Sequence, residues 1–357
     1  MALARLNLTD FRNHAELEIR PEAQFIALHG SNGAGKTNIL EAVSLLVPGR
    51  GLRRAAMSDM PRTEGKGGFT IVAEVGGNVI GTGVSAEQPE RRKVRVNESN
   101  ATINSLADWL SVIWLTPAMD RLFADGAAVR RRFLDRLVLA LDPSHAPLSN
   151  RYEKAMQQRN RLLSGTMPPD PLWLDALEAQ MAESGRAIQA ARHAVVEALA
   201  AQLRNTSSGP FAKPRIALVE KLPTLDGDFA AEWRKGRRRD AAAGRTLVGP
   251  HRADLNVMHS ASGQVAAQCS TGEQKALLLS LILAHAAIVS TQRDRSPILL
   301  LDEVAAHLDP SRRSSLFSLL EETGAQVWMT GTEPQLFRGI GSSAQLLPVG
   351  EFSTPAP

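Results

Sequence analysis

The sequence predicts an α/β fold whose parallel sheet is built from both ends of the chain, with a helical lobe inserted between them. Near the carboxyl end, the apolar runs 298–301 and 326–329 have the composition of buried parallel strands. Near the amino end, Phe25–Leu28 is a similar run that stops at a glycine-rich loop. In the middle of the chain, apolar residues recur at helical spacing instead, which indicates several helices in succession.

Local periodicity predicts the individual elements. Alternation of apolar and polar residues favours strands at 3–8, 15–28 and 69–96, the last of them interrupted by a tight turn at Gly76-Gly77. Helical spacing predicts helices, in chain order, at residues 37–46, 128–141, 150–163, 172–203 and 272–291.

Charge divides the chain in the same way as periodicity. Residues 121–245 contain 21 Lys and Arg against 14 Asp and Glu, a net charge of +7, which leaves −3 for the rest of a chain whose total is +4. We therefore expect a head formed by residues 1–120 and 246–357 and a basic helical lobe formed by residues 121–245. Such a concentration of positive charge favours an anionic partner.

The composition argues against several classes of protein. The single cysteine, Cys269, allows no intrachain disulfide and no thiol metal cluster, which is typical of a reducing compartment. The first ten residues lack the apolar core of a signal peptide. The longest apolar stretch, 276–289, is shorter than the ~20 residues that cross a bilayer and is broken by Ser280 and His285. We therefore expect a cytoplasmic protein with no membrane helix and no membrane partner.

Residues 30–37 fit the phosphate-binding pattern G-x-x-x-x-G-K-[ST], between an apolar strand and a helix. In such a loop, backbone N–H groups converge on phosphate oxygens, and the amino end of the helix adds positive potential. We expect Lys36 to act in catalysis by contacting the β- and γ-phosphates of ATP, and the Thr37 hydroxyl to bind Mg²⁺. The expected nucleotide contacts in this loop are Gly30, Ser31, Asn32, Gly33, Ala34, Gly35, Lys36 and Thr37. A structural glycine-rich turn is the alternative.

The apolar strand at 298–301 is followed directly by two acids, Asp302 and Glu303. Neighbouring like charges cost energy, so a buried strand rarely ends in them without a use. We expect Asp302 to bind Mg²⁺ and the nucleotide, and Glu303 to act as the catalytic residue that polarises the attacking water. Two acids that merely end a strand are the alternative, and the phosphate-binding loop in the same chain favours the functional interpretation.

Residues 270–274, Ser-Thr-Gly-Glu-Gln, precede a long apolar helix. Ser270 and Glu273 have the spacing of a capping box, which needs no ligand to explain it. A capped helix start with the adjacent Gly272 is also suited to a γ-phosphate, so both interpretations hold together. The order of these features along the chain is typical of ABC ATPases: the phosphate-binding loop, this segment, and a strand that ends in two acids. In such an ATPase, Ser270 and Gly272 would contact the nucleotide.

Two further segments bear on the mechanism. Residues 306–309 look like the D-loop of ABC ATPases, which contacts the opposite subunit, although a plain loop into the next helix is the alternative. Thr330–Glu333 ends the last apolar strand, where ABC proteins usually place a histidine that senses the γ-phosphate. That histidine is absent, and no glutamine occurs near 114–116. We therefore expect slow hydrolysis.

The middle of the chain has two basic clusters, at 130–132 and 234–239. A charge run is usually a solvated face. Two clusters in a lobe of net charge +7 nevertheless favour contacts to phosphate backbone. The expected DNA contacts are Arg130, Arg131, Arg132, Arg237, Arg238 and Arg239.

Segments along nearly the whole chain resemble the RecF family of bacterial recombination mediators. The phosphate-binding loop and the acid pair are shared by a whole superfamily, whereas three short patterns are more specific: Phe-Arg-Asn, Arg-Arg-Arg-Phe-Leu-Asp and Gly-Pro-His-Arg. The matching segments are residues 6–13, 30–37, 49–51, 130–135, 158–160, 249–254, 270–274 and 301–303.

The resemblance implies an ABC-type, Rad50-like ATPase head with a short helical second lobe. It further implies a slow, DNA-stimulated ATPase that forms a homodimer when it binds ATP. It implies work with RecO and RecR in DNA repair, replication and recombination, and in the SOS response. There the family loads RecA at gapped DNA, which joins single-stranded and duplex segments.

Three other functions compete with this interpretation. In the ATPase subunit of an ABC transporter, the signature lies much closer to the phosphate-binding loop than the 234 residues that separate Lys36 from Ser270. A chromosome-structural ATPase of the SMC or Rad50 type has a similar head but needs a far longer coiled coil. A metabolic phosphotransferase would explain neither residues 270–274 nor the basic lobe.

Overall fold

A five-stranded parallel sheet joins the two ends of the chain in the computed structural model. The strand order is β13-β3-β12-β11-β8, and every neighbouring pair is parallel. The side chains of β3, β8, β11 and β12 are largely buried, as expected for a sheet that is covered on both faces, whereas those of the edge strand β13 are partly exposed. The strands are β3 (Phe25–His29), β8 (Val112–Leu115), β11 (Ile298–Leu301), β12 (Gln326–Gly331) and β13 (Ala344–Pro348).

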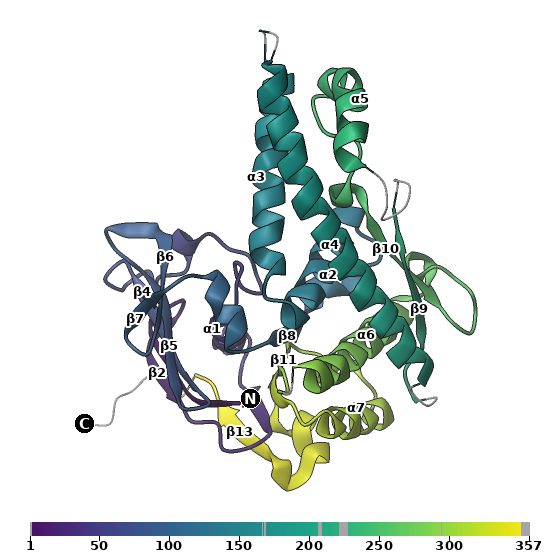
Figure 1. Cartoon of the computed structure of the whole chain (residues 1–357). Helices are drawn as coiled ribbons and strands as arrows, with labels where there is room; N and C mark the ends of the chain where they lie inside the picture. The colour runs from purple at the N-terminus through teal and green to yellow at the C-terminus, as the bar shows by residue number, and fades with distance from the viewer. Residues whose placement is uncertain are drawn as a thin grey trace. The chain divides into compact units, whose positions relative to one another are not determined.

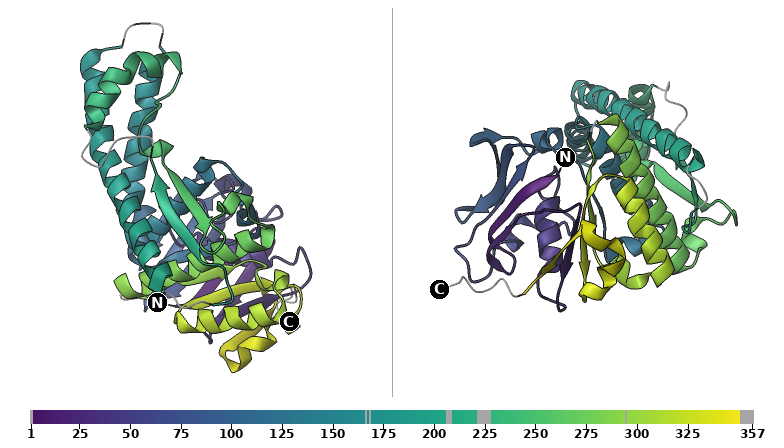
Figure 2. Two further views of the ribbon diagram at one scale, coloured as in Figure 1. Left: turned by 90° about the vertical axis from the view of Figure 1, so that its right-hand side faces the viewer. Right: turned by 90° about the horizontal axis from the view of Figure 1, so that it is seen from below.

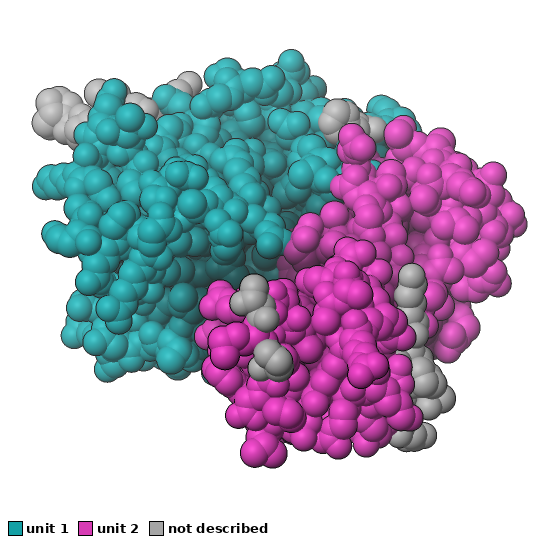
Figure 3. All heavy atoms as spheres, turned by 90° about the horizontal axis from the view of Figure 1, so that it is seen from above, with its two compact units in different colours: residues 1–120, 208–211, 278–357 teal, residues 121–207, 212–277 magenta. Residues whose placement is uncertain are grey.

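The chain folds into two units (Figure 3). The first comprises residues 1–120, 208–211 and 278–357, and the second comprises residues 121–207 and 212–277. Each unit has a hydrophobic cluster of its own. The structure describes residues 2–165, 167, 169–205, 209–220, 228–293 and 295–350.

In the first unit, helix α1 (Lys36–Ser44) packs between the parallel sheet and a six-stranded antiparallel sheet (Figure 2). One buried cluster contains Leu6 and Ile71 of the antiparallel sheet, Val43 of α1 and Leu300 of the parallel sheet. The antiparallel order is β2-β1-β4-β5-β6-β7. These strands are β1 (Leu3–Phe11), β2 (His14–Ile19), β4 (Phe69–Val75), β5 (Asn78–Ser85), β6 (Gln88–Val96) and β7 (Ser99–Ala101).

The second unit contains a long antiparallel helix pair, α3 (His145–Leu163) and α4 (Pro171–Asn205), as Figure 1 shows. Helices α2 (Ala127–Leu141) and α5 (Phe229–Ala242) pack against this pair. Strands β9 (Pro214–Val219) and β10 (Asp254–His259) form a two-stranded antiparallel sheet.

Helix α6 (Thr271–Gln292) begins in the second unit and ends in the first, and α7 (Pro310–Glu322) lies wholly in the first. By length and composition α6 could cross a membrane, but 61% of its most apolar window is buried inside the protein. That burial is typical of a core helix. Short 3-10 helices occupy Met57–Asp59, Asn104–Asp108, Pro117–Arg121, Pro250–Arg252, Ala266–Gln268, Ala305–His307 and Pro334–Ser343.

The main differences from the sequence-based expectations are at element ends and in short elements. The range 15–28 contains two strands, β2 and β3, because residues 20–24 leave the antiparallel sheet before the parallel sheet begins. Helix α3 starts at His145, five residues before the expected start, because Pro147 occupies its first turn, where no backbone N–H bond is lost. The basic run 234–239 lies within a helix, α5.

The structure also groups residues 246–277 differently from the expected head and lobe. These residues lie in the second unit, whereas the expected lobe ended at 245. Strand β10 pairs along its whole length with β9, which belongs to the expected lobe. In addition, Trp233 donates its indole N–H to the carbonyl of Val248 at 2.7 Å, and Arg192 donates to that of Pro250 at 2.6 Å.

A buried charge network links α3, α4 and α5. The side chain of Arg159 is fully buried, and it donates to Glu178 and Asp240, both at 2.8 Å and both buried. Its other donors reach the Thr246 hydroxyl at 3.0 Å and the Trp233 carbonyl at 2.9 Å. Because charges are removed from water only at a high cost, each needs its partners in place.

The Gly-Pro-His-Arg segment joins the same region. Gly249 has φ +136°, and a side chain there would put its Cβ 2.6 Å from the Tyr152 hydroxyl. Tyr152 donates to Nδ1 of His251 at 2.7 Å, and Nε2 of His251 donates to the Thr246 carbonyl at 2.9 Å. Burial, with smaller contributions from the nearby Arg252 and Arg131, lowers the pKa of His251 to about 4. His251 is therefore a neutral structural residue.

Removing Arg159 should destabilise the second unit strongly. In Arg159→Met, Asp240 loses its buried cationic partner, which should cost about 3–5 kcal/mol of unfolding free energy. Denaturant unfolding would measure the change. Arg161→Met is the control, since Arg161 is exposed two residues further along α3 and its loss should change stability by less than about 0.5 kcal/mol. Equal effects in the two variants would contradict the role of the network.

Acidification should destabilise the fold through His251. The unfolded chain binds a proton near the ordinary pKa of 6.5, whereas the folded chain does so only near 4. Stability should therefore fall as pH drops through this window, by at most about 3 kcal/mol from this group. Unfolding free energy measured from pH 7.5 to 4.5 should fall less steeply in His251→Gln than in the parent. His259→Gln, in the same unit, should keep the parent's slope, and equal slopes in all three proteins would argue against the assignment.

Candidate functional site

The phosphate-binding loop lies in the first unit, at the carboxyl end of β3. Helix α1 starts at Lys36, and Gly35 before it has φ +104°, a conformation that favours glycine. The ammonium of Lys36 donates to the carbonyls of Gly30 at 2.7 Å and Ser31 at 2.8 Å. The lysine is buried, while Ser31, Asn32 and the next residue are exposed. A cation is therefore held beneath an exposed loop at a helix start, which suits a phosphate.

The turn between β1 and β2 supports this loop. Asn13 donates from its side-chain amide to the carbonyl of Ala34 at 3.0 Å and accepts from the Asn38 amide at 2.7 Å. Nε2 of His14 lies 3.3 Å from the carbonyl of Gly35, and burial lowers the pKa of this histidine. A side chain on Gly35 would place its Cβ 2.5–2.7 Å from Asn13 and His14. The glycine therefore permits the turn and the loop to touch.

Arg12 fixes the same turn to α1. It forms a two-point ion pair with Glu41, at 2.8 and 2.9 Å, and donates to the carbonyl of Asp59 at 2.8 Å. The carboxylate of Glu41 is fully buried and lies 3.2 Å from the guanidinium of Arg53. Such two-point pairs are strong and directional. The Phe-Arg-Asn pattern thus has a structural role beside the phosphate-binding loop.

The acid pair meets the phosphate-binding loop although 265 residues separate them in sequence. Oγ1 of Thr37 donates to Oδ1 of Asp302 at 2.9 Å, and Asp302 is buried. Mg²⁺ in nucleotide sites commonly takes one or two protein oxygens together with phosphates and waters. A hydroxyl and a carboxylate at this separation fit that donor set. Among the described residues no group of three or more His, Cys, Asp or Glu could hold a metal ion by itself.

Glu303 adopts an unusual backbone conformation. Its φ is +54°, in the left-handed region that residues other than glycine seldom occupy. Its backbone N–H donates to Oγ1 of Thr330 at 2.9 Å, and the same hydroxyl donates to Oδ1 of Asp302 at 2.8 Å. Backbone strain of this kind often accompanies functional sites.

Residues 270–274, the expected signature segment, contain the start of α6 and lie in the second unit. The Ser270 hydroxyl and backbone N–H both donate to Glu273, at 2.7 and 2.8 Å, and the Glu273 N–H donates back to the hydroxyl at 3.3 Å. These bonds form the capping box that the spacing predicts, and the bond from Ser270 lowers the pKa of Glu273. Ser270 and Gly272 are exposed. The expected contact of Ser270 and Gly272 with nucleotide remains a proposal.

The segment 306–309 leads into α7. Its last residue, Asp309, is the N-cap of that helix, and its carboxylate accepts from the backbone N–H of Arg312 at 3.0 Å. This bond lowers the pKa of Asp309. The capping contact explains the aspartate, and a contact with a second subunit remains a proposal.

The two basic clusters contain arginines in different environments. Arg130 forms a two-point pair with Asp254, both bonds at 2.8 Å, and Arg131 donates to the carbonyl of Ala253 at 2.7 Å. In α5, Arg237 bonds Asp175 at 2.5 Å and Glu178 at 2.6 Å. Arg239 lies 3.9 Å from Glu232. The exposed members of the two clusters are Arg132, Arg234, Lys235, Arg238 and Arg239.

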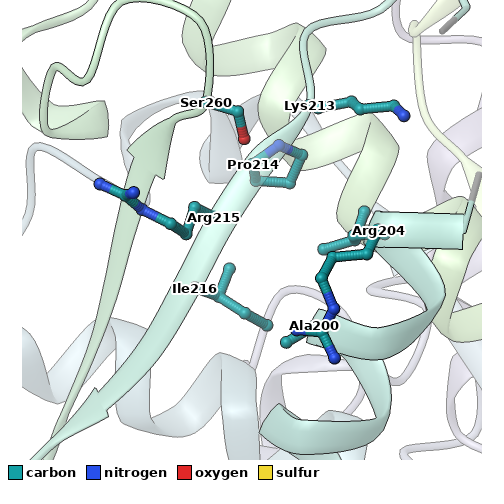
Figure 4. Close-up of a pocket in the computed structure, with 8 residues that line it drawn as sticks. Ala200, Arg204, Lys213, Pro214, Arg215, Ile216 and Ser260 are labelled. Carbon is teal, nitrogen blue, oxygen red and sulfur yellow. The ribbon is translucent and has the colours of Figure 1, made fainter.

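A cavity of about 310 Å³ lies elsewhere in the second unit, between the end of α4 and the start of β9. Its apolar lining includes Leu203 and Ile216, and its rim carries Arg204, Lys213 and Arg215. Figure 4 shows these three cationic side chains extending in different directions. They do not converge on one point, so the cavity lacks the focused charge of a phosphate site.

Sequence reasoning missed the supporting residues of the site. It gave no role to Asn13, His14 or Glu41, and it considered Thr330 only where a histidine was expected. One signal was available, because Glu41 is the single charged residue in the apolar run 39–43 and so needed a buried partner.

Comparison with known proteins agrees with the resemblance. A family model described as the RecF/RecN/SMC N terminal domain matches residues 2–347. The DNA replication and repair protein RecF of Mesorhizobium japonicum is 49% identical over 363 residues, covering 97% of this chain and 96% of that protein. RecF of Brucella abortus is 48% identical over 364 residues, covering 98% of this chain and 94% of that protein.

Solved structures share the fold. The recombination mediator RecF-ATPrS of the RecFOR pathway has a TM-score of 0.82 at 21% identity, covering 98% of this chain and 96% of that one. An Smc head domain from Pyrococcus furiosus has a TM-score of 0.55 at 16% identity, covering 97% and 92%. The ABC-type head is therefore the fold of this chain. With a family model matched over almost its whole length and close to half of its residues identical to these relatives, the chain belongs to the RecF family.

Proposed function

We propose that this chain is an ATP-dependent, DNA-binding recombination mediator of DNA replication and repair. It binds ATP with Mg²⁺ in the first unit and hydrolyses it slowly. The observation that carries the proposal is the bond between Thr37 and Asp302, which brings a phosphate-binding loop and an acid-ended strand to one point. The names of the relatives, DNA replication and repair protein RecF, support it.

Lys36, Thr37, Asp302 and Glu303 have distinct roles in this proposal. The ammonium of Lys36 already faces the loop and would contact the β- and γ-phosphates. Thr37 and Asp302 would hold Mg²⁺, which neutralises charge that develops on the phosphates. Glu303 would orient and polarise the attacking water. The remaining loop residues would bind phosphate through their backbone N–H groups.

The proposal includes a homodimer that ATP holds together. The amino end of α6, with the exposed Ser270 and Gly272, would contact the γ-phosphate of ATP bound by a second copy. Since ATP would then bind only the dimer at full strength, ligand linkage would stabilise the dimer. Residues 306–309 would line the same interface.

The second unit would bind DNA through its exposed arginines. Arg132 and Arg238 on different helices are suited to phosphate backbone, which binds proteins through charge and without sequence preference. Gapped DNA, with single-stranded and duplex segments side by side, is the proposed substrate. By family resemblance we also propose RecO and RecR as partners, loading of the recombinase at gaps, and a place in the cytoplasm.

Complementation between two inactive variants should test the composite site. Lys36→Ala should lose ATP binding, and Ser270→Arg should bind ATP but remain monomeric and inactive. A mixed dimer keeps one intact site. It combines the unaltered phosphate-binding loop of the Ser270→Arg subunit with the unaltered residues 270–274 of the Lys36→Ala subunit. Mixing should therefore restore ATPase activity, up to about half of the parental rate per mixed dimer.

Two controls define the outcome of this experiment. Ser270→Thr keeps the helix cap and should stay active, while Glu303→Gln should bind ATP and accumulate as a dimer. Sizing with and without ATP follows the dimer in each case. Rapid hydrolysis by monomeric Ser270→Arg would refute the shared site and leave Ser270 as a helix cap alone.

Charge reversal at the exposed arginines should weaken DNA binding. Each lost phosphate contact reduces the magnitude of the slope of log affinity against log salt by about 0.9 on duplex DNA. The double variant Arg132→Glu/Arg238→Glu should therefore reduce the magnitude of this slope by about twice that amount. Arg186→Glu, an exposed arginine of α4 outside both clusters, is the charge-matched control. Affinity should be measured on gapped, single-stranded and duplex DNA. A salt slope equal to that of the parent would exclude both arginines as contacts.

A further inference from the structure

A single buried hydroxyl joins the two acids of the candidate active site. Thr330 lies near the end of β12, is 0% exposed, and places Oγ1 2.8 Å from Oδ1 of Asp302 and 2.9 Å from the backbone N of Glu303.

The direction of both bonds follows from chemistry. The backbone N–H of Glu303 can only donate, so the hydroxyl oxygen accepts from it. The hydroxyl has one proton, and an ionised carboxylate can only accept, so that proton goes to Asp302. The rotation of the Thr330 hydroxyl is therefore fixed, and one group orients a carboxylate and a backbone amide together.

The bond to Glu303 is placed where the chain leaves the sheet. The preceding N–H, of Asp302, still donates to the carbonyl of Leu115 in β8 at 2.9 Å. The next N–H, that of Glu303, donates to the side chain of Thr330 and not to a backbone carbonyl. At this residue the backbone turns to φ +54°. Since few residues other than glycine adopt this conformation, the bond that the Glu303 N–H donates to Thr330 helps to hold it.

We infer that Thr330 is a positioning residue for ATP hydrolysis, acting through Glu303 and Asp302. Its hydroxyl holds the Glu303 backbone in the conformation from which the side chain reaches the attacking water. It also holds the oxygen of Asp302 that Thr37 shares. The inference rests on the proposed ATPase function. A hydroxyl near the carboxyl end of β12 thus helps to organise the site, in a chain without histidine at residues 330–333.

Two substitutions separate the hydroxyl from the shape of the side chain. Thr330→Val keeps the branched shape in this buried position and replaces the hydroxyl by a methyl group, while Thr330→Ser keeps the hydroxyl. Misplacement of a catalytic group by about 1 Å can cost on the order of 100-fold in rate, so the valine variant should lower kcat by about 10- to 100-fold. The serine variant should recover the rate to within about threefold of the parent, since its hydroxyl can make the same bonds.

Binding measurements distinguish positioning from a general loss of structure. Thr330→Val should bind ATP in the presence of Mg²⁺ within about threefold of the parent, because the loop contacts remain. It should also accumulate as an ATP-bound dimer, as Glu303→Gln is expected to do. Thr246→Val, which removes a buried, bonded threonine hydroxyl from the second unit, should keep the parental kcat.

A double variant tests whether Thr330 acts through Glu303. Added to Glu303→Gln, Thr330→Val should slow hydrolysis by less than threefold, because groups that act as one unit give non-additive losses. Three results would overturn the inference: a parental kcat in Thr330→Val, equal losses of kcat in the serine and valine variants, or a loss of ATP binding as large as the loss of kcat. A parent protein that fails to bind or hydrolyse ATP would instead overturn the proposed function.

Discussion

Asp302 accepts hydrogen bonds from two threonine hydroxyls that approach it from different parts of the chain, and the arrangement of the first unit makes this meeting possible. Thr37 follows β3, Asp302 follows β11, and Thr330 lies in β12. Since the three strands are neighbours in a parallel sheet, their carboxyl ends lie at one edge. The sheet thus brings polar residues from distant segments together at this edge. Because α1 is buried between two sheets, the phosphate-binding loop before it is held at the same edge.

The second unit uses its charges differently. Many of its arginines point inward or along the surface to acids, as Arg159 does with Glu178 and Asp240 and Arg130 does with Asp254. Net charge therefore overstates the surface that is available to an anionic ligand. The positive balance of this unit is real, but only a subset of its cations is exposed and suited to meet a phosphate.

The sequence was most informative where a pattern has a single physical explanation. Apolar runs and helical periodicity predicted most long elements, and the loop at 30–37 and the acids at 302–303 were found from composition and context. Short or polar elements such as β8, α5 and β13 were missed, because tertiary pairing determines them more than local propensity does. The contacts of Asn13 and Thr330 could not be predicted, since common polar residues gain their roles only when the fold brings partners to them.

The left-handed backbone at Glu303 sets the preference of the backbone against the proposed catalytic role of the side chain. A glycine would adopt φ +54° without strain and would fit the turn at least as well, yet it would bring no carboxylate to the site. Replacing Glu303 by glycine is therefore a change that folding would tolerate or favour and that the proposed hydrolysis would not. Engineering for thermostability can rank substitutions by backbone preference alone. Such a ranking would select against Glu303, the residue on which turnover is proposed to depend.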